Sequence, residues 1–118
     1  MNKSVELFAT AEEQQRVKDD IAEIGFGDWD GHTNAEVEQK WPGLYAQWKG
    51  DISLSPPGGG ESLQIFDERV TEGRRRILNK FAGSTVIVVS HVMPIRGLIR
   101  TAMSADWAAY WRVSVAPC

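Results

Sequence analysis

The sequence is poor in the residues from which disulfide frameworks and metal sites are built. Its 118 residues include one cysteine, Cys118, and two histidines, His32 and His91. A lone cysteine forms no intramolecular disulfide, and no spacing of these residues is typical of a zinc site. We therefore expect neither a metal nor another cofactor, and the cysteine usage favours a reducing, cytoplasmic location.

Long apolar runs and a strong charge of either sign are also missing. No stretch is long enough to cross a membrane, and the amino terminus lacks the apolar core of a signal peptide. The net charge of −3 argues against a dedicated nucleic-acid binder. The one dense basic run, residues 74–76, lies within a helical pattern and is interpreted as a solvated helix face. With 42% apolar and 25% charged residues, the chain has the composition of one ordinary soluble domain, residues 1–118.

Residues 85–99 are the most informative part of the sequence. Residues 85–90 form an unbroken, mostly apolar run, which is typical of a strand covered on both faces of an α/β sheet. Pro94 suits the first position of a helix, and apolar residues then recur at helical spacing. His91 therefore lies where a buried strand ends and a helix begins, a place that collects anionic ligands. The alternative is a histidine that only bonds to a loop carbonyl.

The rest of the chain predicts further helices and one more strand. Helical patterns cover residues 5–17, 43–49 and 61–81, and Thr33 with Glu36 forms a capping box that begins another helix. The loop at residues 51–60 contains three successive glycines without a following Gly-Lys-Ser/Thr, which favours a connector or lid over a nucleotide site. Residues 111–115 alternate like a half-buried strand. This order of elements is that of an α/β fold.

Three segments combine with this pattern. They are residues 22–31 (Ala-Glu-Ile-Gly-Phe-Gly-Asp-Trp-Asp-Gly), residues 57–63 with Arg69 and Val70 shortly after, and residues 89–96 (Val-Ser-His-Val-Met-Pro-Ile-Arg). In this order and at these separations the chain resembles the histidine phosphatase superfamily, the phosphoglycerate-mutase-like group. The resemblance covers nearly the whole chain. It implies a three-layer α/β/α fold and a small phosphorylated metabolite as substrate.

The resemblance also implies roles for individual residues. Glu23 falls on the acid that protonates the leaving oxygen, and His91 on the second histidine of the pocket, which binds the transferring phosphoryl group. Val92 falls on the adjoining phosphate-binding position, where glycine is common in the family. The chemistry agrees, since a departing alcohol needs a proton donor and the phosphoryl oxygens need fixed donors. The alternative for Glu23 is a solvated loop carboxylate.

The family's Arg-His-Gly tripeptide, whose histidine becomes phosphorylated, occurs nowhere in this sequence. The resemblance therefore suggests an incomplete sheet that lacks the amino-terminal and final strands, and a chain that is inactive by itself. We expect a phosphomonoesterase domain that needs a complementing amino-terminal segment or that forms a homo-oligomer. The alternatives are a non-catalytic phosphate-binding or interaction module, and a gene whose upstream DNA encodes the missing part.

Overall fold

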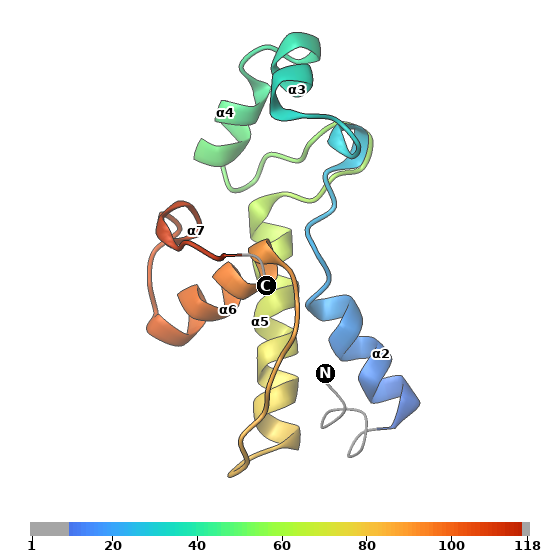
Figure 1. Ribbon diagram of the computed structural model, residues 1–118, viewed down its shortest axis with the longest axis vertical. Helices are drawn as coiled ribbons and strands as arrows, with labels where there is room; N and C mark the ends of the chain where they lie inside the picture. Colours follow the sequence, from blue (N-terminus) through green and yellow to red (C-terminus); the bar gives the residue numbers. More distant parts are fainter. Residues whose placement is uncertain (1–9, 117–118) are drawn as a thin grey trace. The chain divides into compact units, whose positions relative to one another are not determined.

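The computed structural model describes residues 10–116, and every regular element in that range is helical. The elements in chain order are α2 (Ala11–Asp20), the 3-10 helix η1 (Gly27–Trp29), α3 (Asn34–Lys40), α4 (Leu44–Gly50), α5 (Leu63–Lys80), α6 (Val92–Met103) and α7 (Ala109–Arg112) (Figure 1). The chain divides into two compact units, one made of Met1–Glu23 and Arg69–Cys118 and the other of Ile24–Glu68. That residues 1–118 act as one domain stays a prediction.

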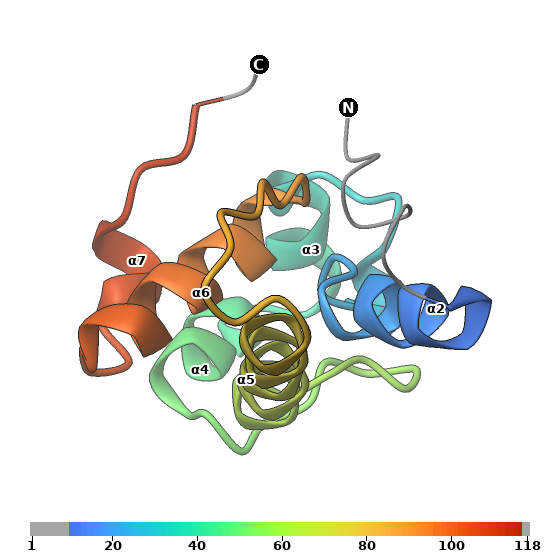
Figure 2. The ribbon, with the colours of Figure 1, turned by 90° about the horizontal axis from the view of Figure 1, so that it is seen from below.

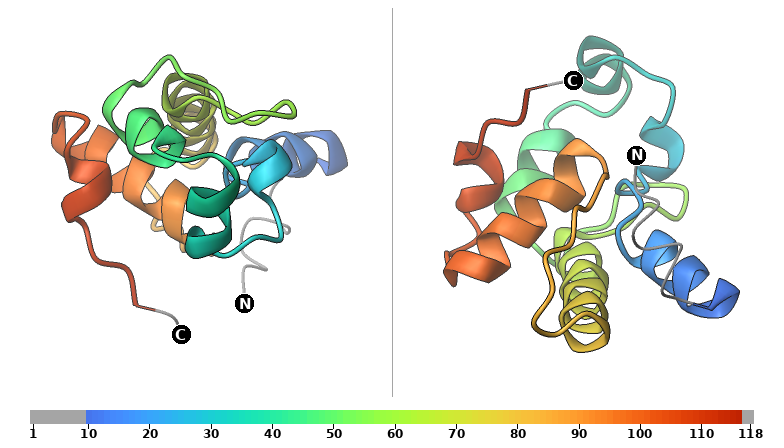
Figure 3. Two further views of the ribbon diagram at one scale, coloured as in Figure 1. Left: turned by 90° about the horizontal axis from the view of Figure 1, so that it is seen from above. Right: turned by 60° about the horizontal axis from the view of Figure 1, so that its bottom comes forward.

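The predicted three-layer α/β/α sheet is wrong, because residues 10–116 contain no strand. Residues 85–91 have no regular structure, and Figure 3 draws them as a plain trace between α5 and α6. Ile87 and Val89 are 65% and 60% exposed, so the run is not covered on both faces either. A strand needs a neighbour that shares its backbone hydrogen bonds, and no residue of the described range provides one for residues 85–90.

The second predicted strand, residues 111–115, is absent as well. Its first two residues belong to α7, and residues 113–116 have no regular structure. Tyr110 explains the helical turn, because this fully buried side chain packs against α6. An alternation over five residues is too short to outweigh such an anchor.

The structure confirms most of the predicted helices. Thr33 and Glu36 form the expected capping box: Thr33 Oγ1 accepts from the Glu36 N–H at 3.2 Å, and Glu36 Oε1 accepts from the Thr33 N–H at 3.1 Å. The predicted helices at residues 43–49 and 61–81 correspond to α4 and α5. The helix predicted at residues 5–17 corresponds in part to α2, which continues to Asp20, while residues 5–9 lie outside the described range. Pro94 occupies the third position of α6 rather than the first, still within the turn where a missing N–H costs nothing.

In the first unit, α2 and α6 lie on opposite sides of α5 (Figure 2). Two glycines allow these helices to approach closely. A methyl group at Gly73 of α5 would lie 2.6 Å from Asp20 Cβ on α2. A methyl group at Gly97 of α6 would lie 2.7 Å from Tyr110 Oη and 3.1 Å from Val70 Cγ1 of α5. Backbone contact between helices, rather than a sheet, thus organises this unit.

The second unit is built around an aromatic cluster. Trp48 of α4 is 1% exposed, and its ring contacts those of Phe26, Trp29 and Tyr45 at centroid distances of 5.5–6.2 Å. The glycine-rich loop is held to residues 25–28 by backbone hydrogen bonds: the Asp28 N–H donates to the Pro57 carbonyl at 2.8 Å. It is therefore an anchored loop, not a free connector.

Candidate active site

His91 lies immediately before α6 as its N-cap residue, with an extended backbone (φ −110°, ψ 174°). The side chain is exposed and makes no capping hydrogen bond. Within residues 10–116 it also bonds to no loop carbonyl, so the plainer explanation of this histidine finds no support there. The first N–H groups of α6, including that of Val92, have no acceptor inside the helix, which favours an anion at this end.

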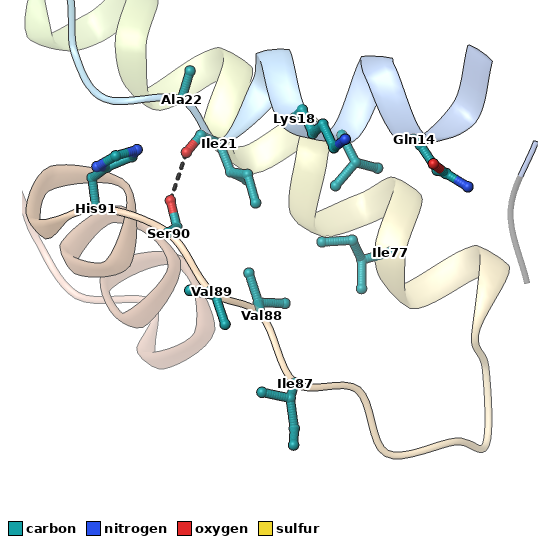
Figure 4. Close-up of a pocket in the computed structure, with 11 residues that line it drawn as sticks. Gln14, Lys18, Ile21, Ala22, Ile77, Ile87, Val88, Val89, Ser90 and His91 are labelled. Carbon is teal, nitrogen blue, oxygen red and sulfur yellow. Dashed lines mark hydrogen bonds between the residues drawn. The ribbon is translucent and has the colours of Figure 1, made fainter. Parts of the chain in front are cut away.

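A pocket of the first unit adjoins His91 (Figure 4). Its polar wall combines side chains from α2 with the residues that precede α6, and its apolar wall comes from α2, α5 and the exposed run. The lining residues are Gln14, Val17, Lys18, Ile21, Ala22, Ile77, Ile87, Val88, Val89, Ser90 and His91. Lys18 and His91 thus both line this cavity, and an ammonium group and an imidazole are each groups that can bind an anion.

Glu23 follows this pocket in the chain but is not one of its lining residues. Its side chain is exposed, whereas its neighbour Ala22 lines the cavity. The structure therefore brings the backbone before Glu23 to the pocket of His91, without placing the Glu23 carboxylate in the wall. Val92 is 39% exposed and also lies outside the lining. The catalytic roles of Glu23 and His91 and the phosphate-binding roles of His91 and Val92 stay predictions.

The turn that leads from α2 to Glu23 is held by two side chains. Ser90 Oγ donates to the Ile21 carbonyl at 2.6 Å (Figure 4). The Arg69 guanidinium donates to the carbonyls of Asp19, Asp20, Ala22 and Glu23 at 2.9–3.2 Å. Both contacts are missed by sequence reasoning, although Arg69 belongs to the segments that carried the resemblance.

The basic residues of α5 also differ from expectation. Arg75 is 58% exposed and pairs with Glu72 on its own helix, as a solvated face predicts. Arg76 instead pairs with Asp20 of α2, and Lys80 Nζ lies 3.2 Å from Glu13 Oε2. Arg69, Arg76 and Lys80 recur at spacings of seven and four and so share one helix face. This spacing in the sequence could have indicated which face of α5 packs against α2.

Two further polar residues, His32 and Arg96, have local partners. His32 Nε2 lies 2.9 Å from Lys40 Nζ, and Arg96 Nη1 donates to Met93 Sδ at 3.8 Å on its own helix. Arg96 therefore contacts a neighbour on its own helix. No group of three or more metal-ligating side chains occurs in the part of the chain that the structure describes. None of the helices in that part is both long and apolar enough to cross a membrane.

Comparison with known proteins decides the family. The sequence profile of the histidine phosphatase superfamily (branch 1) matches residues 3–118. The chain belongs to this superfamily. The resemblance implies a sheet, whereas the regular elements of residues 10–116 are all helices, so the family assignment depends on the sequence match.

Several relatives of this histidine phosphatase superfamily member carry phosphatase names. It is 31% identical over 105 residues to phosphoserine phosphatase 1 of Hydrogenobacter thermophilus, covering 88% of this chain and 50% of the relative. It is 27% identical over 96 residues to the adenosylcobalamin/alpha-ribazole phosphatase of Escherichia coli, covering 81% and 47%. A protein of Mycobacterium tuberculosis named as bifunctional is 44% identical over 97 residues, covering 82% and 26%. The chain thus spans half or less of the length of these relatives.

Proposed function

We propose that this chain is the part of a phosphomonoesterase-type histidine phosphatase that supplies the phosphate-binding histidine and the acid. In the intact enzyme, a phosphohistidine carried by an Arg-His-Gly segment transfers the phosphoryl group to water, and the substrate is a small phosphorylated metabolite. The chain by itself is inactive because its sequence contains no such nucleophile. Family membership and the phosphatase names of the relatives support the reaction class.

The observation that carries this proposal is His91 at the amino end of α6, beside a cavity that Lys18 also lines. A phosphoryl group in that cavity gains hydrogen bonds from the imidazole, charge neutralisation from the ammonium group and the field of the helix. Glu23, at the end of the turn that borders the cavity, then protonates the leaving alcohol oxygen. These interactions stabilise the negative charge that spreads over the phosphoryl oxygens during transfer.

The test is a reconstitution. Hydrolysis of p-nitrophenyl phosphate is measured for the chain alone and with a synthetic amino-terminal segment that carries Arg-His-Gly. We expect no turnover by the chain alone and turnover by the mixture, lost again with His91→Asn, Glu23→Gln, or a segment whose histidine is replaced by alanine. A complex that forms without any turnover counts against the proposal.

A second function, that of a non-catalytic module, is favoured by the absence of an Arg-His-Gly tripeptide from this sequence. His32 is not a convincing substitute, because its Nε2 already lies 2.9 Å from Lys40 Nζ. The chain would then be a non-catalytic module that binds phosphate or a partner protein. Orthovanadate and phosphate titrations discriminate: binding that His91→Asn abolishes, combined with no turnover in any reconstituted complex, favours this module. Size-exclusion chromatography tests the predicted homo-oligomer, and fractionation tests the predicted cytoplasmic location.

A further inference from the structure

The five successive carbonyl groups of residues 19–23 all accept a hydrogen bond from a side chain of another segment. Four of them bind the guanidinium group of Arg69, through Nη1 to Asp19, Asp20 and Ala22 and through Nη2 to Glu23. The fifth, that of Ile21, binds the hydroxyl group of Ser90. These residues form the last turn of α2 and the chain that leaves it, here named the 19–23 turn.

Such an arrangement is unusual for a helix end. The last carbonyls of a helix have no partner within the helix and normally bond to water or to a glycine-based cap. The residue directly after the C-cap of α2 is Ala22 and not a glycine, and the C-cap residue Ile21 is buried. The planar guanidinium fork takes the place of such a cap and holds several carbonyls at once, which an ammonium group cannot do with the same geometry.

The two donors connect the turn to different parts of the site. Arg69 comes from the middle of α5, which Gly73 brings against α2. Ser90 directly precedes His91, so one peptide unit separates the turn's hydrogen bond from the predicted phosphate-binding histidine. Glu23 and His91 are thus fixed to a common backbone frame, although their side chains come from segments 68 residues apart in sequence.

We infer that Arg69 and Ser90 are positioning residues, which hold the backbone of Glu23 in register with His91. They act through their hydrogen bonds to the carbonyls of the 19–23 turn. An effect of these two residues on catalysis rests on the proposed function, whereas their effect on the structure of the 19–23 turn does not. A displacement of about 1 Å at the acid is enough to lower the rate of proton transfer substantially.

The first experiment measures the holding itself, by amide hydrogen exchange in the chain alone. The N–H groups of Ile21 and Ala22, both in this turn, donate to the carbonyls of Val17 and Asp19 at 3.1 and 3.4 Å. We expect exchange at both amides to accelerate about fivefold in Ser90→Ala and at least as much in Arg69→Lys. Ser90→Thr keeps the hydroxyl group and restores slow exchange. The matched controls, Ser114→Ala and Arg112→Lys, alter exposed residues and leave these amides unchanged.

The second experiment measures the catalytic consequence in the reconstituted enzyme. A general acid matters most when the leaving group is a poor one, so hydrolysis of β-glycerophosphate depends on Glu23 more than hydrolysis of p-nitrophenyl phosphate. We divide kcat/KM for β-glycerophosphate by kcat/KM for p-nitrophenyl phosphate. We expect Ser90→Ala and Arg69→Lys to lower this ratio about tenfold, and Glu23→Gln to lower it as well. A general loss of folded protein lowers both rates equally and leaves the ratio unchanged.

The outcomes separate the inference from the proposed function. Wild-type exchange rates in both variants overturn the inference, and so does an unchanged leaving-group ratio in an active enzyme. Failure of Ser90→Thr to restore slow exchange removes Ser90 from the pair. If the reconstituted wild type hydrolyses neither ester, the proposed function fails, while the exchange measurements still decide whether Arg69 and Ser90 hold the turn.

Discussion

Replacing Gly73 by alanine places one methyl group between α5 and α2. The added Cβ would lie 2.6 Å from Asp20 Cβ and 3.3 Å from Ile21 Cγ2. Asp20 Cβ is attached directly to the backbone, so this contact is not relieved by rotating a flexible side chain. The separation must grow by about 1 Å to reach an ordinary van der Waals distance, which moves the 19–23 turn away from α5.

The expected magnitude is the difference of two effects. Alanine is favoured over glycine inside a helix by about 1 kcal/mol. Crowding a well-packed contact costs about 1–3 kcal/mol. Gly73→Ala should therefore lower the free energy of unfolding by about 0–2 kcal/mol. The displacement also lengthens the Arg69 hydrogen bonds, so the local effect on the 19–23 turn exceeds the global one.

The assay combines urea denaturation with amide exchange at Ile21 and Ala22. The control is Gly50→Ala at the end of α4, where nothing lies within 4 Å of the added Cβ and helix propensity alone acts. We expect Gly50→Ala to be neutral or stabilising and Gly73→Ala to be destabilising with faster exchange in the turn. A Gly73→Ala protein that is more stable than wild type, with exchange unchanged, refutes the close approach of α2 and α5.

Three further predictions test other parts of the structure. Gly97→Ala forces a methyl group against the buried Tyr110 hydroxyl and should lower the thermal midpoint in a circular dichroism melt; an unchanged midpoint contradicts the α6–α7 packing. Thr33→Ala removes the capping box and should destabilise α3 by about 1 kcal/mol, seen as faster amide exchange in that helix, while equal exchange argues against the cap. The hydrogen bond from Lys80 holds the pKa of Glu13 below its usual 4.5. The stability that this pair contributes is therefore present above pH 4.5 and is lost as the pH falls through the lower pKa of the folded state. In melts at different pH, Glu13→Gln should be less stable than wild type at neutral pH and equal to it in strong acid.

Local signals in the sequence predicted the helices well. The capping box at Thr33 and the apolar stripe of α5 both depend on residues three to seven positions apart, and such neighbours meet in any helix. The stripe residues Leu63, Phe66 and Val70 are accordingly fully buried. Local patterns also predicted that His91 directly precedes a helix, which the structure confirms. The order and spacing of three motifs predicted the family.

The sequence also predicted an imidazole directly before a helix, at His91, and an acid at Glu23, and these 118 residues contain no Arg-His-Gly tripeptide. What it did not determine is whether residues 85–91 form a strand, since the β state depends on a partner's backbone and not on the run itself. Tertiary structure alone decided that Arg69 and Ser90 hold the turn before Glu23, because those hydrogen bonds join main-chain carbonyls to residues 46–69 positions away. Every residue has the same carbonyl group, so the pattern of side chains in the sequence does not predict which carbonyls accept these hydrogen bonds.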